Sequence, residues 1–231
     1  MLHIHRYKII IASLLLALAS KGMAQGNLPM YDTRTWHFGF TLGFGQTNFK
    51  LNRSDAFWKS DSISSVICKP RAGFNLGVLA NLHLHDQLDL RFLPSISFAQ
   101  RDIRFDFRDS SYAVAKIESA YLDFPLVMKY KTIRHRNIRF YVLAGVQFSY
   151  DLQSNKGADV KPNSAYLAVN PVNFGYQIGC GLDLYFPYFK FSPELKLTNG
   201  FNNALVRDNS VYSSAIESLF SKIVQLNFYF E

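Results

Sequence analysis

The chain has 231 residues, 48% of them hydrophobic, and a formal net charge of +8 at pH 7. The basic residues are scattered through predicted turns and loops instead of gathering with aromatics on one face, so the charge does not indicate nucleic-acid binding. Two cysteines, Cys68 and Cys180, are too few for a disulfide framework.

Residues 1–24 have the pattern of a secretory signal peptide. An apolar run of about eleven residues, Ile9 to Ala19, follows a basic start, and the small-x-small tripeptide Gly22-Met23-Ala24 precedes Gln25. We expect cleavage before Gln25, which leaves residues 25–231 as one domain. No other apolar run approaches the roughly 20 residues of a membrane-spanning helix, which argues against a helical inner-membrane protein.

Eight later segments alternate apolar and polar residues with a period of two, the pattern of β-strands with one apolar face. In the first, large apolar residues at even positions alternate with small residues at odd positions. Strands of roughly 10 to 15 residues fit a tilted crossing of the hydrocarbon layer of a membrane. We expect them at residues 36–45, 71–85, 88–100, 119–131, 137–150, 172–186, 189–198 and 223–231.

The connections between these segments alternate in length. Three are very short, whereas the other four span about 18 to 25 residues, and this alternation is typical of outer-membrane barrels. The sequence therefore predicts an all-β fold: an eight-stranded antiparallel up-and-down transmembrane β-barrel. An even number of strands places both termini on one side, which we expect to be the periplasm.

The polar face of the strands carries charges that a soluble core would have difficulty burying. A secreted lipocalin-like barrel has the same strand order, but burying several charges in its core would be costly unless they were paired. In a membrane barrel they can pair across a narrow, filled lumen. The predicted lumen residues are Asp89, Arg91, Asp123, Lys129, Arg139, Asp183, Glu194 and Lys196.

Aromatic residues gather where the predicted strands would cross the two membrane surfaces. Trp36, Tyr130, Tyr185 and Tyr188 fall near the periplasmic surface, and Phe98, Tyr150 and Tyr176 near the outer one. Three prolines, Pro94, Pro125 and Pro193, fall inside predicted strands, where each removes a ladder hydrogen bond. We expect bulges or rim positions there.

The histidines argue against a surface enzyme. On this topology His37, His83, His85 and His135 all lie at the periplasmic end, away from the outer rim where an acyl-transfer or protease base would be needed. His83 and His85 could share a metal, but no third ligand is obvious beyond Asp86, and a hydrated rim is the simpler interpretation. We predict no catalytic, cofactor or metal site.

The richest basic cluster surrounds the turn at residues 132–136. Such residues commonly anchor a barrel to lipid headgroups. A sharper hypothesis is a docking patch for an acidic periplasmic partner, made of Lys131, Arg134, His135 and Arg136.

Several stretches resemble one known family. They are LRFLPSISFAQR at 90–101, YLDFPLVMKY at 121–130, GCGLDLYF at 179–186, PELK at 193–196 and NFYFE at 227–231. Together they resemble the PorT-type outer-membrane barrels of Bacteroidetes. The LDFPL segment belongs to the wider barrel superfamily, whereas the first stretch, with its proline and trailing Gln-Arg, narrows the match.

The resemblance implies a role in the type IX secretion system, which moves folded cargo across the outer membrane. A filled eight-stranded barrel is too narrow to be that conduit. We therefore expect a non-enzymatic accessory or assembly component in the cell outer membrane, in contact with outer-membrane lipid and other secretion-machine proteins. The alternative is a structural or adhesin-like surface barrel without a secretion role. Neither needs a cofactor, a small-molecule substrate or nucleic acid.

Overall fold

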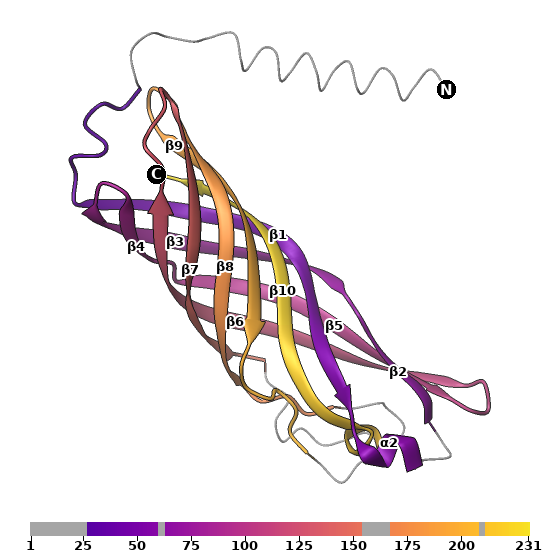
Figure 1. Ribbon diagram of the computed structural model, residues 1–231. Helices are drawn as coiled ribbons and strands as arrows, with labels where there is room; N and C mark the ends of the chain where they lie inside the picture. The colour runs from indigo at the N-terminus through magenta and orange to yellow at the C-terminus, as the bar shows by residue number, and fades with distance from the viewer. Residues whose placement is uncertain (1–26, 60–62, 154–166, 208–210) are drawn as a thin grey trace, which may run out of the picture.

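A computed structural model describes residues 27–59, 63–153, 167–207 and 211–231, and these form one closed antiparallel sheet (Figure 1). The strands of the described ranges are β1 (Trp36–Arg53), β2 (Ile63–Lys69), β3 (Arg71–His85), β4 (Leu88–Phe92), β5 (Ser95–Phe107), β6 (Tyr112–Lys131), β7 (Ile138–Asp151), β8 (Val172–Tyr185), β9 (Lys190–Gly200) and β10 (Ile216–Phe230). Two short helices, α2 (Asp55–Lys59) and α3 (Val211–Ser214), lie in connections.

The sheet closes because β1 pairs with β10 on one edge and with β3 on the other. Strands β4 and β5 together occupy one place in the ring, since β3 and β6 each pair with both of them. Strand β2 lies outside the ring and pairs with β5. Eight strands therefore form the barrel, which confirms the predicted fold class.

The barrel has two different ends. The end that carries Trp36, Phe230 and the short turns after β3, β6 and β8 is called the turn end here, and the opposite end is the loop end. Figure 1 shows the β8–β9 connection at the turn end and α2 at the loop end. No helix among the described residues is long and apolar enough to cross a membrane.

The strands reach further toward the loop end than the sequence predicted. A long loop was expected at residues 101–118, but β5 and β6 continue through most of it and leave only the turn Arg108–Ser111. The expected loop at 46–70 likewise contains the end of β1, α2 and β2. Of the connection between β7 and β8, residues 154–166 lie outside the described ranges.

The polarity of the two faces reverses partway along the barrel. On β1, Phe38, Phe40 and Phe44 are exposed on the outer face, but further along that face Lys50 and Asn52 follow. The inner face changes in the opposite sense, from Gly39 and Thr41 to the buried Phe49. The same change occurs on β5, β6 and β10, where the outward side chains beyond the apolar band include Gln100, Lys116, Glu118 and Lys222.

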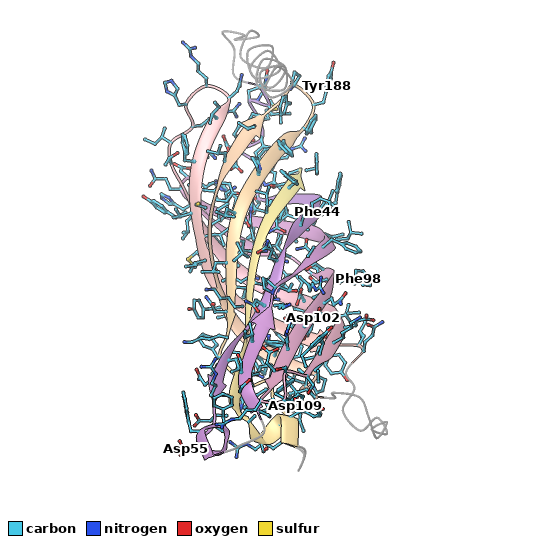
Figure 2. All side chains as sticks on the ribbon, turned by 90° about the vertical axis from the view of Figure 1, so that its right-hand side faces the viewer. Phe44, Asp55, Phe98, Asp102, Asp109 and Tyr188 are labelled. Atoms are coloured by element: carbon cyan, nitrogen blue, oxygen red, sulfur yellow. The ribbon has the colours of Figure 1, made fainter. Side chains whose placement is uncertain are left out.

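On the membrane topology that the sequence predicts, this reversal is the point at which the strands leave the lipid. Within the apolar band the outer face suits hydrocarbon and the inner face is polar. Beyond it, buried apolar side chains fill the interior, among them Ile103, Phe105, Ile117, Ile216 and Leu219. Figure 2 shows Phe44 and Phe98 between Tyr188 at the turn end and Asp102, Asp109 and Asp55 toward the loop end.

The three strand prolines are accommodated without bulges. Phe92 pairs with Leu126 and Ser95 with Asp123, so two residues separate the two pairs on both strands and the register does not shift across Pro94 and Pro125. The carbonyl of Pro94 still accepts from Val78 N–H at 3.0 Å. On β9, Pro193 pairs with Phe228 in unbroken register. The expected bulges are therefore wrong: the ladder has gaps while the register is kept.

Most of the predicted interfacial aromatics face outward. Trp36, Tyr130 and Tyr188 are exposed at the turn end, and Phe98, Tyr150 and Tyr176 line the other boundary of the apolar band. Tyr185 is the exception because only 3% of its surface is exposed. It faces the lumen, and its assignment to the girdle is wrong.

The polarity reversal predicts that a charge will be tolerated differently along the outer face. Ala144 lies in the middle of β7 and faces outward between Met128 and Ile178. We expect Ala144→Arg to lower the free energy of unfolding by about 2–4 kcal/mol, the cost of an arginine near the bilayer centre. Urea unfolding of the wild type and the variant in lipid vesicles measures this difference in the free energy of unfolding.

Gln100→Arg is the matched control because Gln100 lies beyond the apolar band, directly opposite Glu118. We expect it to change stability by less than about 0.5 kcal/mol, as at most surface sites. Equal destabilisation by the two arginines would contradict the boundary placed between Phe98 and Gln100.

Candidate functional site

The lumen near the turn end holds a dense set of buried charges. Each of the eight charged residues predicted to face the lumen is buried, with Arg91 and Lys129 fully enclosed. Lys190 and Glu231, which are not among the predicted lumen residues, belong to the same cluster. The cluster contains four cations and four anions: Arg91, Lys129, Lys131 and Lys190 with Asp89, Asp183, Glu194 and Glu231.

Arg91 is the centre of this network. Its guanidinium lies 3.4 Å from a carboxylate oxygen of Glu194 and 3.2 Å from one of Glu231. It also sits 5.3 Å from the ring centroids of both Tyr141 and Tyr229. The two tyrosine hydroxyls donate to Glu194 at 2.9 and 2.8 Å. The arginine is thus held by two carboxylates and two aromatic faces, a combination that offsets its loss of water.

Lys129 and Asp183 form a second buried pair. Lys129 Nζ donates to both carboxylate oxygens of Asp183 at 2.7 Å and lies 3.7 Å from the Tyr141 ring centroid. Gly181 leaves the room that Tyr141 needs, because a Cβ at Gly181 would lie 2.5 Å from the tyrosine hydroxyl. The small inner residues of β8 therefore make space for the large ones of β7.

Lys131 points into the lumen and not toward a partner. Its Nζ lies 2.7 Å from Asp89 Oδ1, and both side chains are nearly fully buried. His83 Nδ1 lies 2.9 Å from the same carboxylate oxygen. Lys131 therefore cannot contribute to the docking patch predicted at the neighbouring turn, and that part of the prediction is wrong.

Uncharged hydrogen-bond partners fill the middle of the lumen. Asp123 accepts from Ser97, from Gln147 at 2.7 Å and from Ser149 at 2.6 Å. Two cavities remain nearby, each of about 10 Å³, and Asp123 and Lys196 line one of them. A volume of this size holds about one water molecule. Side chains therefore fill the described lumen.

Arg101 separates the polar lumen from the apolar interior of the loop end. Its guanidinium donates to Tyr121 Oη at 2.9 Å and to Ser221 Oγ at 3.2 Å, and it lies 4.6 Å from the Phe49 ring centroid. Arg101 was not among the predicted lumen residues because it lies one residue beyond the predicted third strand, which ends at residue 100. Its odd position, in phase with the inward Ser95 and Ser97, was the available signal.

The segment before β1 covers the turn-end mouth of the barrel. Tyr31 Oη donates to Glu231 Oε2 at 2.6 Å and accepts from Lys190 Nζ at 2.7 Å. Burial, together with the adjacent Glu231 carboxylate, raises the pKa of Tyr31, so the hydroxyl keeps its proton and donates. Asp32 binds Arg139 at 2.9 Å. Residues 27–35 therefore add a lid to the charge network.

Arg134 belongs to this lid. Its guanidinium stacks 3.8 Å from the Tyr185 ring centroid and donates to the carbonyls of Asn27 and Leu28. Of the four residues predicted as a docking patch, only His135 and Arg136 are exposed. Arg136 has a φ of 54°, a left-handed conformation that turns the chain back toward β7.

The amino-acid sequence matches one family over most of its length. Residues 23–206 match the family model described as "Outer membrane protein beta-barrel domain". The chain belongs to this family, and it is an outer-membrane β-barrel. No curated protein matches it.

Solved structures similar to this outer-membrane barrel are themselves outer-membrane proteins. OprG from Pseudomonas aeruginosa is 13% identical, with a TM-score of 0.45 over 83% of this chain and 92% of OprG. Neisserial surface protein A is 9% identical, with a TM-score of 0.42 over 85% and 98%. Ail of Yersinia pestis, in complex with a heparin analogue, is 13% identical, with a TM-score of 0.38 over 85% and 99%.

The histidines of this barrel either bond to groups inside the lumen and under the lid or lie exposed at the turn end. His37 is buried, stacks on Tyr31 and bonds to the Tyr31 carbonyl at 2.8 Å. His83 joins Asp89 and Lys131, whereas His85 and His135 are exposed. Across the described residues, no three His, Cys, Asp or Glu side chains are arranged to hold a metal ion.

The buried Lys129–Asp183 pair predicts a strongly non-additive response to mutation. Lys129→Met leaves Asp183 enclosed without its main partner, and we expect a loss of about 3–5 kcal/mol in the free energy of unfolding. Removing both charges with Lys129→Met and Asp183→Leu should cost less than the single change. A double-mutant cycle measured by urea unfolding in lipid vesicles tests this, and strictly additive losses would contradict it.

Proposed function

We propose that this outer-membrane barrel is a non-enzymatic accessory or assembly component of type IX protein secretion. The resemblance of its strands to PorT-type barrels is the reason for proposing this secretion system. The filled lumen carries the rest of the proposal: cargo cannot pass where Arg91, Lys129 and their carboxylate partners occupy the interior. A barrel of this kind would bind other secretion proteins through its surfaces and would not form the pore itself.

We propose further that the turn end faces the periplasm and that residues 1–24, which lie outside the described ranges, form a signal peptide removed before Gln25. Short turns on the periplasmic side and longer excursions outside are the rule for bacterial barrels. The short turns after β3, β6 and β8 and the extended strands at the other end support this orientation.

The proposed periplasmic contact is the turn between β6 and β7. His135 and Arg136 are exposed there, while the backbone of the turn is held by Arg134 and by reciprocal His135–Ile138 hydrogen bonds of 3.0 and 3.1 Å. A rigid turn with exposed basic groups suits an acidic partner, because little ordering entropy is lost on binding.

Deleting the gene in the source organism tests the secretion role. We expect proteins normally exported to the cell surface to accumulate in the periplasm, and plasmid-borne wild type to restore their export. Fractionation with immunoblotting of an exported protein measures the result. Normal export in the deletion strain would refute the secretion role.

Complementation with two variants at one position then tests the proposed contact. Arg136→Asn keeps a residue that tolerates the left-handed conformation and removes the charge, whereas Arg136→Glu reverses it. We expect export to fall about tenfold or more with Arg136→Glu and less with Arg136→Asn, with unchanged barrel levels in the membrane. Full export with both variants would place the contact elsewhere.

A surface-binding barrel is the second candidate function. The observation that favours it is the extension of β1, β5 and β6 beyond the apolar band, which builds a packed platform with Trp58 72% exposed. In that case deletion would leave export normal and lower binding of cells to a host or matrix surface.

A further inference from the structure

The ladder between β1 and β3 ends next to Pro70, and β2, which precedes Pro70, does not pair with β1. β1 pairs with β3 from Trp36 as far as Thr47, whose partner is Arg71. Pro70 lies between β2 and β3 and has no N–H group, so it cannot continue this ladder. Beyond it β2 pairs with β5, and β1 pairs with β10. One edge of β1 from Asn48 onward and one edge of β2 therefore lack a strand partner.

The two edges border an open cleft of about 620 Å³, called the β1–β2 cleft here. Its lining includes Asn48, Phe49 and Leu51 from β1, Trp58 from α2, and Val66 and Cys68 from β2. Figure 1 shows α2 and β2 at the loop end, with α2 following β1. The volume lies in the range of ligand-binding clefts.

Side chains occupy places that a neighbouring strand would fill. The N–H of Phe49 donates to Asn48 Oδ1 at 2.8 Å, and the carbonyl of Val66 accepts from Arg53 Nη2 at a long 3.5 Å. In an antiparallel strand, alternate residues direct both backbone groups to the same side. Cys68, two residues from Val66, therefore directs its N–H and carbonyl toward the cleft as well.

Positive charge surrounds the cleft. The exposed basic residues are Lys50 and Arg53 on β1 and Lys69 on β2. Arg71, where β3 begins, has a side chain that is 51% exposed, although it donates to Asp102 at 2.8 Å. No ion pair joins Lys50 or Lys69 to an acid among the described residues. The rim therefore favours an occupant with negative charge.

We propose that the β1–β2 cleft accepts an extended acidic segment of a partner protein as an added strand. Peptide groups can bond to the backbone groups of both edges and replace the side chains that now bond to Phe49 and Val66, which is the basis of recognition by strand addition. An acyl chain would displace water from these groups without replacing its hydrogen bonds, which is unfavourable. Exposed Trp58 and Ile67 offer contacts for the apolar side chains of such a segment. The inference does not rest on a secretion role.

Peptide binding to the full chain in lipid nanodiscs tests the proposal. The probe is a fluorescent eight-residue peptide of alternating valine and glutamate, and its comparison is the same peptide with lysine in place of glutamate. We expect the glutamate peptide to bind at least about tenfold more tightly, with the difference shrinking as salt is raised. Equal affinities, or no binding of either peptide, would overturn the proposal.

A proline at residue 68 tests the strand geometry. Cys68→Pro removes an N–H directed into the cleft and spares the groups that bond to β5, whereas Cys68→Ala changes the side chain alone. We expect the proline variant to bind the glutamate peptide about five- to tenfold more weakly, as for the loss of a hydrogen bond. The alanine variant should match the wild type. Equal binding by both variants, with both barrels folded by circular dichroism, would overturn the proposal.

Charge reversal supplies a second, independent measurement. Lys50→Glu combined with Lys69→Glu should reverse the preference in favour of the lysine peptide, and Lys116→Glu on β6 should leave it unchanged. An unchanged preference in the double variant would contradict the proposal. A dimeric wild type that binds no peptide and becomes monomeric with Cys68→Pro would also overturn it, because the occupant would be a second copy of the chain.

Discussion

The structure depends on the mutual pairing of charges that lipid would otherwise exclude. Within the apolar band only the inner face can hold polar groups, and the lumen is too narrow to hydrate them. Arg91 is therefore enclosed by Glu194, Glu231 and two tyrosine rings, and Lys129 by Asp183 and Tyr141. Such pairs offset a desolvation cost that either partner alone could not meet. The same pairing that stabilises the closed sheet also fills its interior.

The pairing also connects segments that are far apart in the sequence. Glu231 and Lys190 exchange backbone hydrogen bonds of 2.7 and 2.9 Å and form an ion pair of 2.8 Å. Tyr31 bonds to both residues, so the segment before β1, the start of β9 and the end of β10 meet at one point. Closing the ring and closing the turn-end mouth are thus parts of one interaction network.

The sequence was informative where one physical rule acts on every residue. Alternation with a period of two identified the eight ring strands and the inward direction of residues such as Arg91 and Lys129, because a strand in lipid has one apolar face. The strand ends were placed too early for a related reason. Beyond Phe44 and Phe98 the apolar residues continue on the opposite face, so the alternation changes phase and no longer predicts a strand there.

Other features depend on contacts between distant residues, which no local pattern records. Lys131 looks like part of a basic turn, but its side chain follows the inward phase of β6 to Asp89. Arg134 looks solvent-facing, but Tyr185 and the carbonyl groups of residues 27 and 28 hold it. Residues 27–35 carry no strand or helix periodicity, so their place over the mouth could not be predicted. The prolines keep register because neighbouring strands maintain it on both sides.

The filled lumen is the central claim, and electrical conductance tests it most directly. Purified protein incorporated into a planar lipid bilayer should show no stable ohmic conductance steps in salt solution. Incorporation would be verified independently by washing vesicles of the same lipid with urea and measuring the protein that remains in the lipid. Reproducible steps of a size expected for an aqueous pore would contradict the account, because they would require an open path past Arg91 and Lys129.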